Sequence, residues 1–101
     1  MLQVWDVFNL KGKGTALYCK DSNFDVMSKN EVKDYIGKIN KIKIYDKNSN
    51  EREFTIKEYD VASSMSNKIS VALLIDKTIE NDDITIPSNI TIIDNKRMES
   101  K

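Results

Sequence analysis

Apolar and polar residues alternate along most of this chain, and a period of two predicts β-strands rather than helices. Five segments carry the pattern: residues 2–10, 15–20, 41–47, 52–59 and 69–75. In the third segment, Ile42 and Ile44 are expected to share the inward face, because successive strand side chains point to opposite sides. The fifth segment, ISVALLI, is nearly continuously apolar and is expected to be the most buried strand.

The first segment predicts which side chains of the N-terminal strand face the core. Counting every second residue assigns one face to Leu2, Val4, Phe8 and Leu10, and the other to Trp5 and Val7. Asp6 interrupts the apolar face. Aromatic residues here, together with Tyr18 of the next segment, are expected to cluster near the mouth of the first hairpin. Such a cluster either fills the core of a small barrel or covers its end, or it offers a surface on which a base can stack.

The rest of the chain adds one helix, two short strands and a tail. SKNEVKDYIG (28–37) begins with Ser28 and Glu31 in capping-box spacing and ends at a glycine expected to be the C-cap, which predicts a short helix near 28–36. ITIPSNITII (84–93) predicts two short strands around Pro87, which belongs at an edge or bend because proline has no N–H. Residues 1–93 are therefore expected to form one all-β domain, followed by a disordered polar tail at 94–101.

Two glycines two residues apart stand between the first two strand segments, in KGKGT (11–15). A phosphate-binding P-loop needs G-x-x-x-x-G-K-[ST] between a strand and a helix, and here the spacing differs and a strand follows. Glycine also supplies the positive φ of a tight turn between antiparallel strands. The pair therefore predicts a hairpin turn, with Lys11 and Lys13 at its exposed tip.

The amino-acid composition excludes most common types of catalytic site. The chain has 101 residues and no histidine, so it lacks the commonest general base and metal ligand. Cys19 is the single cysteine, which excludes an intrachain disulfide and favours a small core side chain over a reactive thiol. The acidic runs ENDD (80–83) and DKNSNERE (46–53) lack the ligand spacing of a calcium loop and are expected to be solvated turns. We therefore expect no enzyme activity, no cofactor and no metal site.

Charge and hydropathy limit the class of partner. Sixteen Lys and Arg residues balance sixteen Asp and Glu residues, without the basic excess typical of a dedicated nucleic-acid binder. No apolar run approaches the ~20 residues that cross a bilayer, and the first residues, MLQVWDVF, do not resemble a signal peptide. A cytoplasmic protein without membrane contact is expected.

The first hairpin also resembles a known family. DVFNLKGKGTALYCKD (6–21) is similar to the DVFxIxGxGTVVxGxV opening of domain II in translational GTPases, most closely elongation factor Tu. NKISVALLIDKTIENDDITIPSNI (67–90) resembles the closing strands of that domain, and YIGKINKIKIYD (35–46) resembles a stretch between them. The resemblance implies a small closed antiparallel β-barrel of six to seven strands. The nucleotide-binding motifs of the GTPase domain are absent from the chain, so no nucleotide is expected.

In that family, the barrel helps to hold the aminoacyl end of transfer RNA. The resemblance therefore implies a binding role for Asp6, Phe8 and Lys13, and for Glu58 as the acidic partner in a later strand. Lys11 and Tyr18 join them as candidates from the hairpin and its aromatic residues. The expected function is a non-enzymatic binding module that contacts RNA, the ribosome or a protein partner. The alternative is a small bacterial immunity or inhibitor protein that binds and masks a toxin or enzyme.

Overall fold

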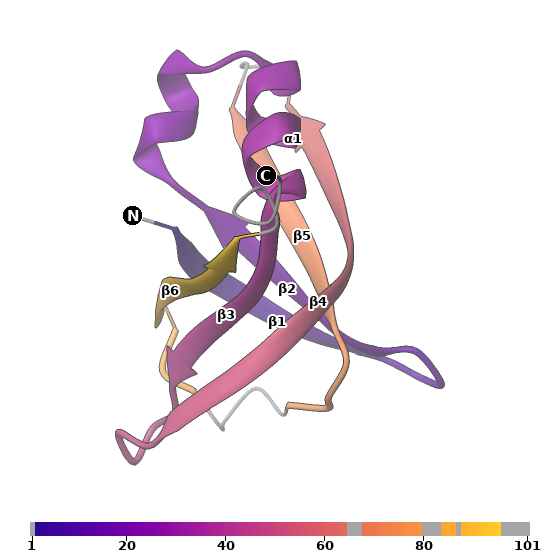
Figure 1. Ribbon diagram of the computed structural model, residues 1–101, viewed down its shortest axis with the longest axis vertical. Helices are drawn as coiled ribbons and strands as arrows, with labels where there is room; N and C mark the ends of the chain where they lie inside the picture. Colours follow the sequence, from indigo (N-terminus) through magenta and orange to yellow (C-terminus); the bar gives the residue numbers. More distant parts are fainter. Residues whose placement is uncertain (1, 65–67, 80–83, 87, 96–101) are drawn as a thin grey trace.

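The computed structural model describes residues 2–64, 68–79, 84–86 and 88–95. Six antiparallel strands in these ranges form a closed barrel in the order β1-β2-β5-β4-β3-β6 (Figure 1). The strands are β1 (Gln3–Leu10), β2 (Gly14–Lys20), β3 (Ile39–Tyr45), β4 (Glu51–Ser63), β5 (Ile69–Ile75) and β6 (Ser88–Asn95). The 3-10 helix η1 (Ser22–Val26) and the helix α1 (Lys29–Gly37) connect β2 to β3. The predicted all-β class, the closed antiparallel barrel and the short helix are confirmed.

Alternating side chains from the strands fill the barrel. In β5 every second residue, from Ile69 to Ile75, is buried, and the strand pairs with β2 on one side and β4 on the other. Ile42 and Ile44 of β3 are fully buried, as their shared face predicts. The wall of the barrel is therefore a single layer of strands. Its inward side chains form the apolar core, and its outward side chains are not needed for that core.

The face assignment of β1 is wrong beyond Trp5, because the strand contains a β-bulge. Val4 pairs with Cys19 and Asp6 with Tyr18, so Trp5 is an extra residue without an opposite partner on β2. An inserted residue moves every later side chain to the other face. Val7 is consequently buried, while Phe8 is 51% exposed.

The two helices cover one end of the barrel (Figure 1). The expected capping box at Ser28 and Glu31 is present, and α1 buries Val32 and Ile36. Gly37 is not the C-cap but the last helical residue, because the chain stays right-handed through the C-cap at Lys38. A side chain at Gly37 would meet the Tyr59 hydroxyl, so this glycine allows β4 to lie close to α1. No helix among the described residues has the length and apolarity needed to cross a membrane.

The connection between β5 and β6 closes the other end. Ile79 and Ile84 are almost fully buried there, and residues 84–86 form bends instead of the first of the two predicted strands. Their alternation comes from side chains that plug the barrel rather than from strand pairing. The predictions for ENDD (80–83) and Pro87 lie outside the described residues. Strand β6 continues through Asn95, so part of the predicted tail belongs to the barrel, and residues 96–101 lie outside the description.

Thr15 ties this connection to the first hairpin. Its side chain is fully buried, its hydroxyl donates to Asn9 Oδ1 at 2.7 Å, and the same oxygen accepts the Ile79 N–H at 3.0 Å. Thr15→Val keeps the shape of the side chain but leaves the Ile79 N–H without this acceptor. We expect the free energy of unfolding to fall by about 2 kcal/mol in urea denaturation. Thr15→Ser keeps the hydroxyl and is expected to lose less, so an equal loss in the two variants would contradict the role of the hydrogen bonds.

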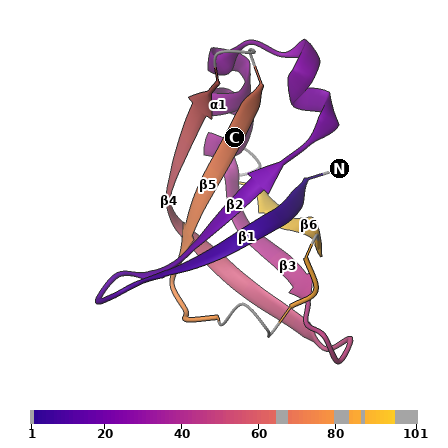
Figure 2. The same cartoon turned by 180° about the vertical axis from the view of Figure 1, so that it is seen from behind.

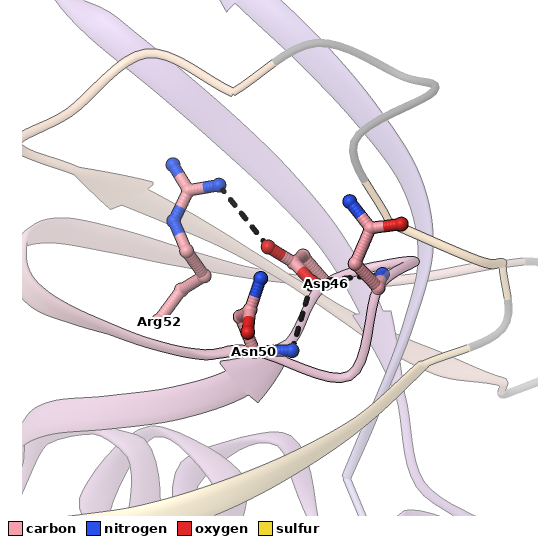
Figure 3. A network of polar contacts seen from close by, with 4 residues as sticks. Asp46, Asn50 and Arg52 are labelled. Carbon is pink, nitrogen blue, oxygen red and sulfur yellow. Dashed lines mark hydrogen bonds and ion pairs between the residues drawn. The ribbon is translucent and has the colours of Figure 1, made fainter.

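The turn between β3 and β4 is stabilised by the carboxylate of Asp46 (Figure 3). Its Oδ1 accepts the backbone N–H groups of Asn48 and Asn50, each at 2.9 Å, and Oδ2 lies 3.9 Å from Arg52 Nη1. These interactions, the Asn50 N–H first, hold the pKa of Asp46 below its ordinary value. The expected charged hairpin tip at 46–53 is confirmed, and the carboxylate of Asp46 is used within the turn.

Candidate binding face

The outward side chains of β1, β2 and β5 form an apolar surface on the wall of the barrel, where these three strands lie side by side (Figure 2). Phe8 pairs with Ala16, and Ala16 with Leu74, so the three residues form one row across the strands. Side chains in such a row share one face of the sheet. We define the outer face as Trp5, Phe8, Leu10, Ala16, Tyr18, Ala72 and Leu74.

Large apolar side chains of the outer face are substantially open to solvent. The exposed fraction is 45% for Trp5, 51% for Phe8 and 41% for Leu10. Single exposed apolar residues are ordinary, but a contiguous group on neighbouring strands marks an interaction surface more often. The alternative in which the aromatic residues of the first hairpin fill the core is therefore wrong for Trp5 and Phe8.

An aromatic hollow of about 510 Å³ lies at the end of the outer face next to η1. Trp5 and Tyr18 line it together, as the expected aromatic cluster predicts, whereas Phe8 lies further along the face. The Lys20 Nζ lies 5.7 Å from the centroid of the Trp5 ring and 5.6 Å from that of Tyr18. An ammonium at this distance is attracted to the negative faces of both rings.

A second hollow of about 330 Å³ lies toward the tip of the β1–β2 hairpin. Its apolar lining includes Leu10, Ala16, Ala72 and Leu74, and its charged lining includes Lys13, Lys57, Glu58 and Asp60. The Lys57 Nζ donates to the Lys13 carbonyl at 3.1 Å, which ties the projecting hairpin to β4. The two hollows share β2 and β5, so the outer face is continuous from η1 to the hairpin tip.

The six candidate residues from the sequence lie along this face rather than in one pocket. Tyr18 lines the aromatic hollow, Lys13 and Glu58 line the second hollow, and Phe8 lies on the face between the bulge and the tip. Lys11 is at the hairpin tip, in a shallow hollow with Asp76. Asp6 lies opposite Tyr18, and its Oδ1 accepts the Val7 N–H at 2.9 Å.

Sequence reasoning did not assign five residues to this surface: Leu10, Ala16, Lys20, Ala72 and Leu74. The last two belong to an apolar run that was expected to be buried, and nothing in the run itself shows that one side lacks a covering layer. Lys20 ends its strand and carries no motif. The only available signal was its spacing, two residues after Tyr18, which puts both side chains on one face.

The arrangement is suited to noncovalent binding. Cys19 is fully buried, and burial raises the pKa of its thiol to about 12, so it is a neutral core side chain as expected. Among the described residues, no three His, Cys, Asp or Glu side chains are grouped so that they could hold a metal ion. What the outer face offers is apolar area, aromatic rings and charges of both signs.

Comparisons with models of protein families, with curated proteins and with solved structures found no match to this chain. The structure shows a closed six-stranded antiparallel barrel, but no comparison assigns the chain to a family. Fold alone does not define function, since one small barrel architecture serves many roles. The role of the outer face therefore has to be inferred from its own side chains.

Proposed function

We propose that this protein is a non-enzymatic binding module that contacts another protein through the outer face. The observation that carries the proposal is the contiguous set of apolar side chains on β1, β2 and β5, of which Trp5, Phe8 and Leu10 are each about half exposed. Protein interfaces have an apolar centre, enriched in aromatic residues, within a polar rim. Aromatic side chains also supply much of the binding energy at such interfaces.

The charges around the outer face favour a protein partner over a nucleic acid. Lys20 and Lys68 line the aromatic hollow together with Asp21 and Asp25. Around the second hollow, two lysines are likewise accompanied by two carboxylates. Surfaces that bind nucleic acids are strongly positive because phosphate neutralisation provides most of their affinity. Apolar floor residues such as Leu74 suit aliphatic side chains better than bases.

The class of partner is supported only by the sequence resemblance. Similarity of the first hairpin and the closing strands to domain II of translational GTPases favours a partner in the translation machinery, and the barrel has the architecture that this resemblance implies. An immunity or inhibitor protein would use the same face to mask a toxin or enzyme. Both versions require the outer face, so one experiment tests their common element.

The test compares two tagged variants in crosslinking pull-downs from native lysate. Phe8→Asp/Leu10→Asp puts charge on the outer face, whereas Ile93→Asp changes a residue of β6 that is 42% exposed, against 41% for Leu10. We expect the first variant to lose a specific protein partner by about tenfold or more, and the second to retain it. Calorimetry with the purified partner then measures the same loss.

Two results would contradict the proposal. If wild type and both variants retain the same proteins equally, the outer face is not the interface. If the wild type instead retains RNA, lost at raised salt and after ribonuclease treatment, the partner is a nucleic acid.

A further inference from the structure

Trp5, the extra residue at the β-bulge in β1, is the second ring of the aromatic hollow. Trp5 follows the inward-facing Val4 and its side chain lines the same hollow as Tyr18, while the bulge makes Asp6 the residue opposite Tyr18. Bulges are common next to functional sites. Without the bulge, strict alternation would place Trp5 directly opposite Tyr18 on the outer face and would turn Asp6 toward the core.

Lys20 lies with its ammonium over both rings, at 5.7 Å from the Trp5 centroid and 5.6 Å from the Tyr18 centroid. In the part of the chain that the structure describes, no carboxylate makes an ion pair with this ammonium. The faces of the two rings attract the ammonium but do not accept conventional hydrogen bonds from it. The three N–H donors of the ammonium therefore remain available to a ligand. Attraction to the two rings also restricts the lysine side chain, which reduces the conformational entropy lost when a ligand binds.

We propose that the aromatic hollow is the subsite for an acidic side chain of the protein partner, whose carboxylate pairs with the Lys20 ammonium. This inference rests on the proposed protein-binding function. The hollow, at about 510 Å³, has ample space for a Glu or Asp side chain. The rings of Trp5 and Tyr18 pack against the apolar stem of that side chain, and the charge-assisted hydrogen bond fixes its end.

Two carboxylates that line the hollow also affect how strongly this subsite binds an acidic side chain. Asp21 Oδ1 accepts the Asn23 N–H at 2.9 Å, so this carboxylate is already used to cap η1. Asp25 is exposed on η1 and lines the hollow, where it repels an incoming carboxylate. Asp25→Asn is therefore expected to strengthen binding of an acidic ligand by a few-fold, and Lys20→Gln to weaken it.

The experiment uses Trp5, the single tryptophan of the chain, as a reporter inside the hollow. Three capped peptides, Ac-Ala-Leu-Glu-Leu-Ala-NH2 and its Gln and Lys counterparts, are titrated into the intact labelled protein, and the Trp5 indole N–H signal is followed by NMR. We expect the Glu peptide to bind about tenfold more tightly than the Gln peptide. Lys20→Gln should abolish this preference, whereas Lys47→Gln, at the distant β3–β4 turn, should preserve it.

Three outcomes would overturn the subsite: equal affinity for the Glu and Gln peptides, a preference for the Lys peptide, or no shift of the indole signal with any peptide. A preference for Glu that persists in Lys20→Gln would likewise overturn the pairing with Lys20. None of these outcomes tests the proposed function, which the pull-downs test separately. Phe8→Asp/Leu10→Asp can lose a partner whether or not the hollow prefers a carboxylate.

Discussion

Gly14→Ala is expected to lower the free energy of unfolding by about 3 kcal/mol, whereas Gly12→Ala is expected to lower it by about 1 kcal/mol. Gly14 has a φ of +124°, and a Cβ there would collide with the Ile75 carbonyl oxygen of β5. Gly12 has a φ of +80°, and a Cβ there would meet open space. The first substitution therefore combines backbone strain with overpacking, and the second adds strain alone.

Urea denaturation of the two variants measures this difference directly. Gly12→Asn is the matched control, because asparagine tolerates a left-handed backbone better than alanine does. Similar losses for Gly12→Ala and Gly14→Ala would show that the contact with β5 is unimportant. The two glycines thus have different purposes: Gly12 turns the hairpin, and Gly14 lets β2 begin directly against the backbone of β5.

Much of the barrel could be predicted because most strands bury one face only. Ile42 and Ile44 alternate with polar residues, and their burial followed directly from that alternation. The bulge in β1 could not be predicted in the same way. The local sequence carries no signal for the extra residue, because its position depends on how β1 pairs with β2. Its consequence is large, because it moves Phe8 from the expected core to the outer face.

The candidate site was only partly predictable for a related reason. Tyr18 and Trp5 could be placed near the first hairpin by their positions in the chain, and the structure puts them in one hollow. The position of the Lys20 ammonium over both rings depends on side-chain conformations that a pattern of alternation does not give. Leu74 was expected in the core because an apolar run reads the same whether one or both of its faces are covered.

The 3-10 helix η1 was not predicted at all, yet it contributes one of the largest buried side chains. Phe24 is 1% exposed and packs in the barrel core, although it comes from a segment of five residues, SNFDV, too short to show a helical period. The same segment supplies Ser22 and Asp25 to the wall of the aromatic hollow. Phe24 therefore links the stability of the barrel to the shape of the hollow.

Phe24→Ala is accordingly expected to lower the free energy of unfolding by about 4 kcal/mol, a large part of the 5–15 kcal/mol typical of a domain. Val26→Ala, in the same helix but at a residue that is 88% exposed, should change it by less than about 0.5 kcal/mol. Thermal unfolding followed by circular dichroism measures both. A loss below about 1 kcal/mol for Phe24→Ala would mean that η1 unfolds separately from the barrel. In that case the wall of the aromatic hollow would form and open independently of the strands, and Lys20 with its two rings would remain the fixed part of the subsite.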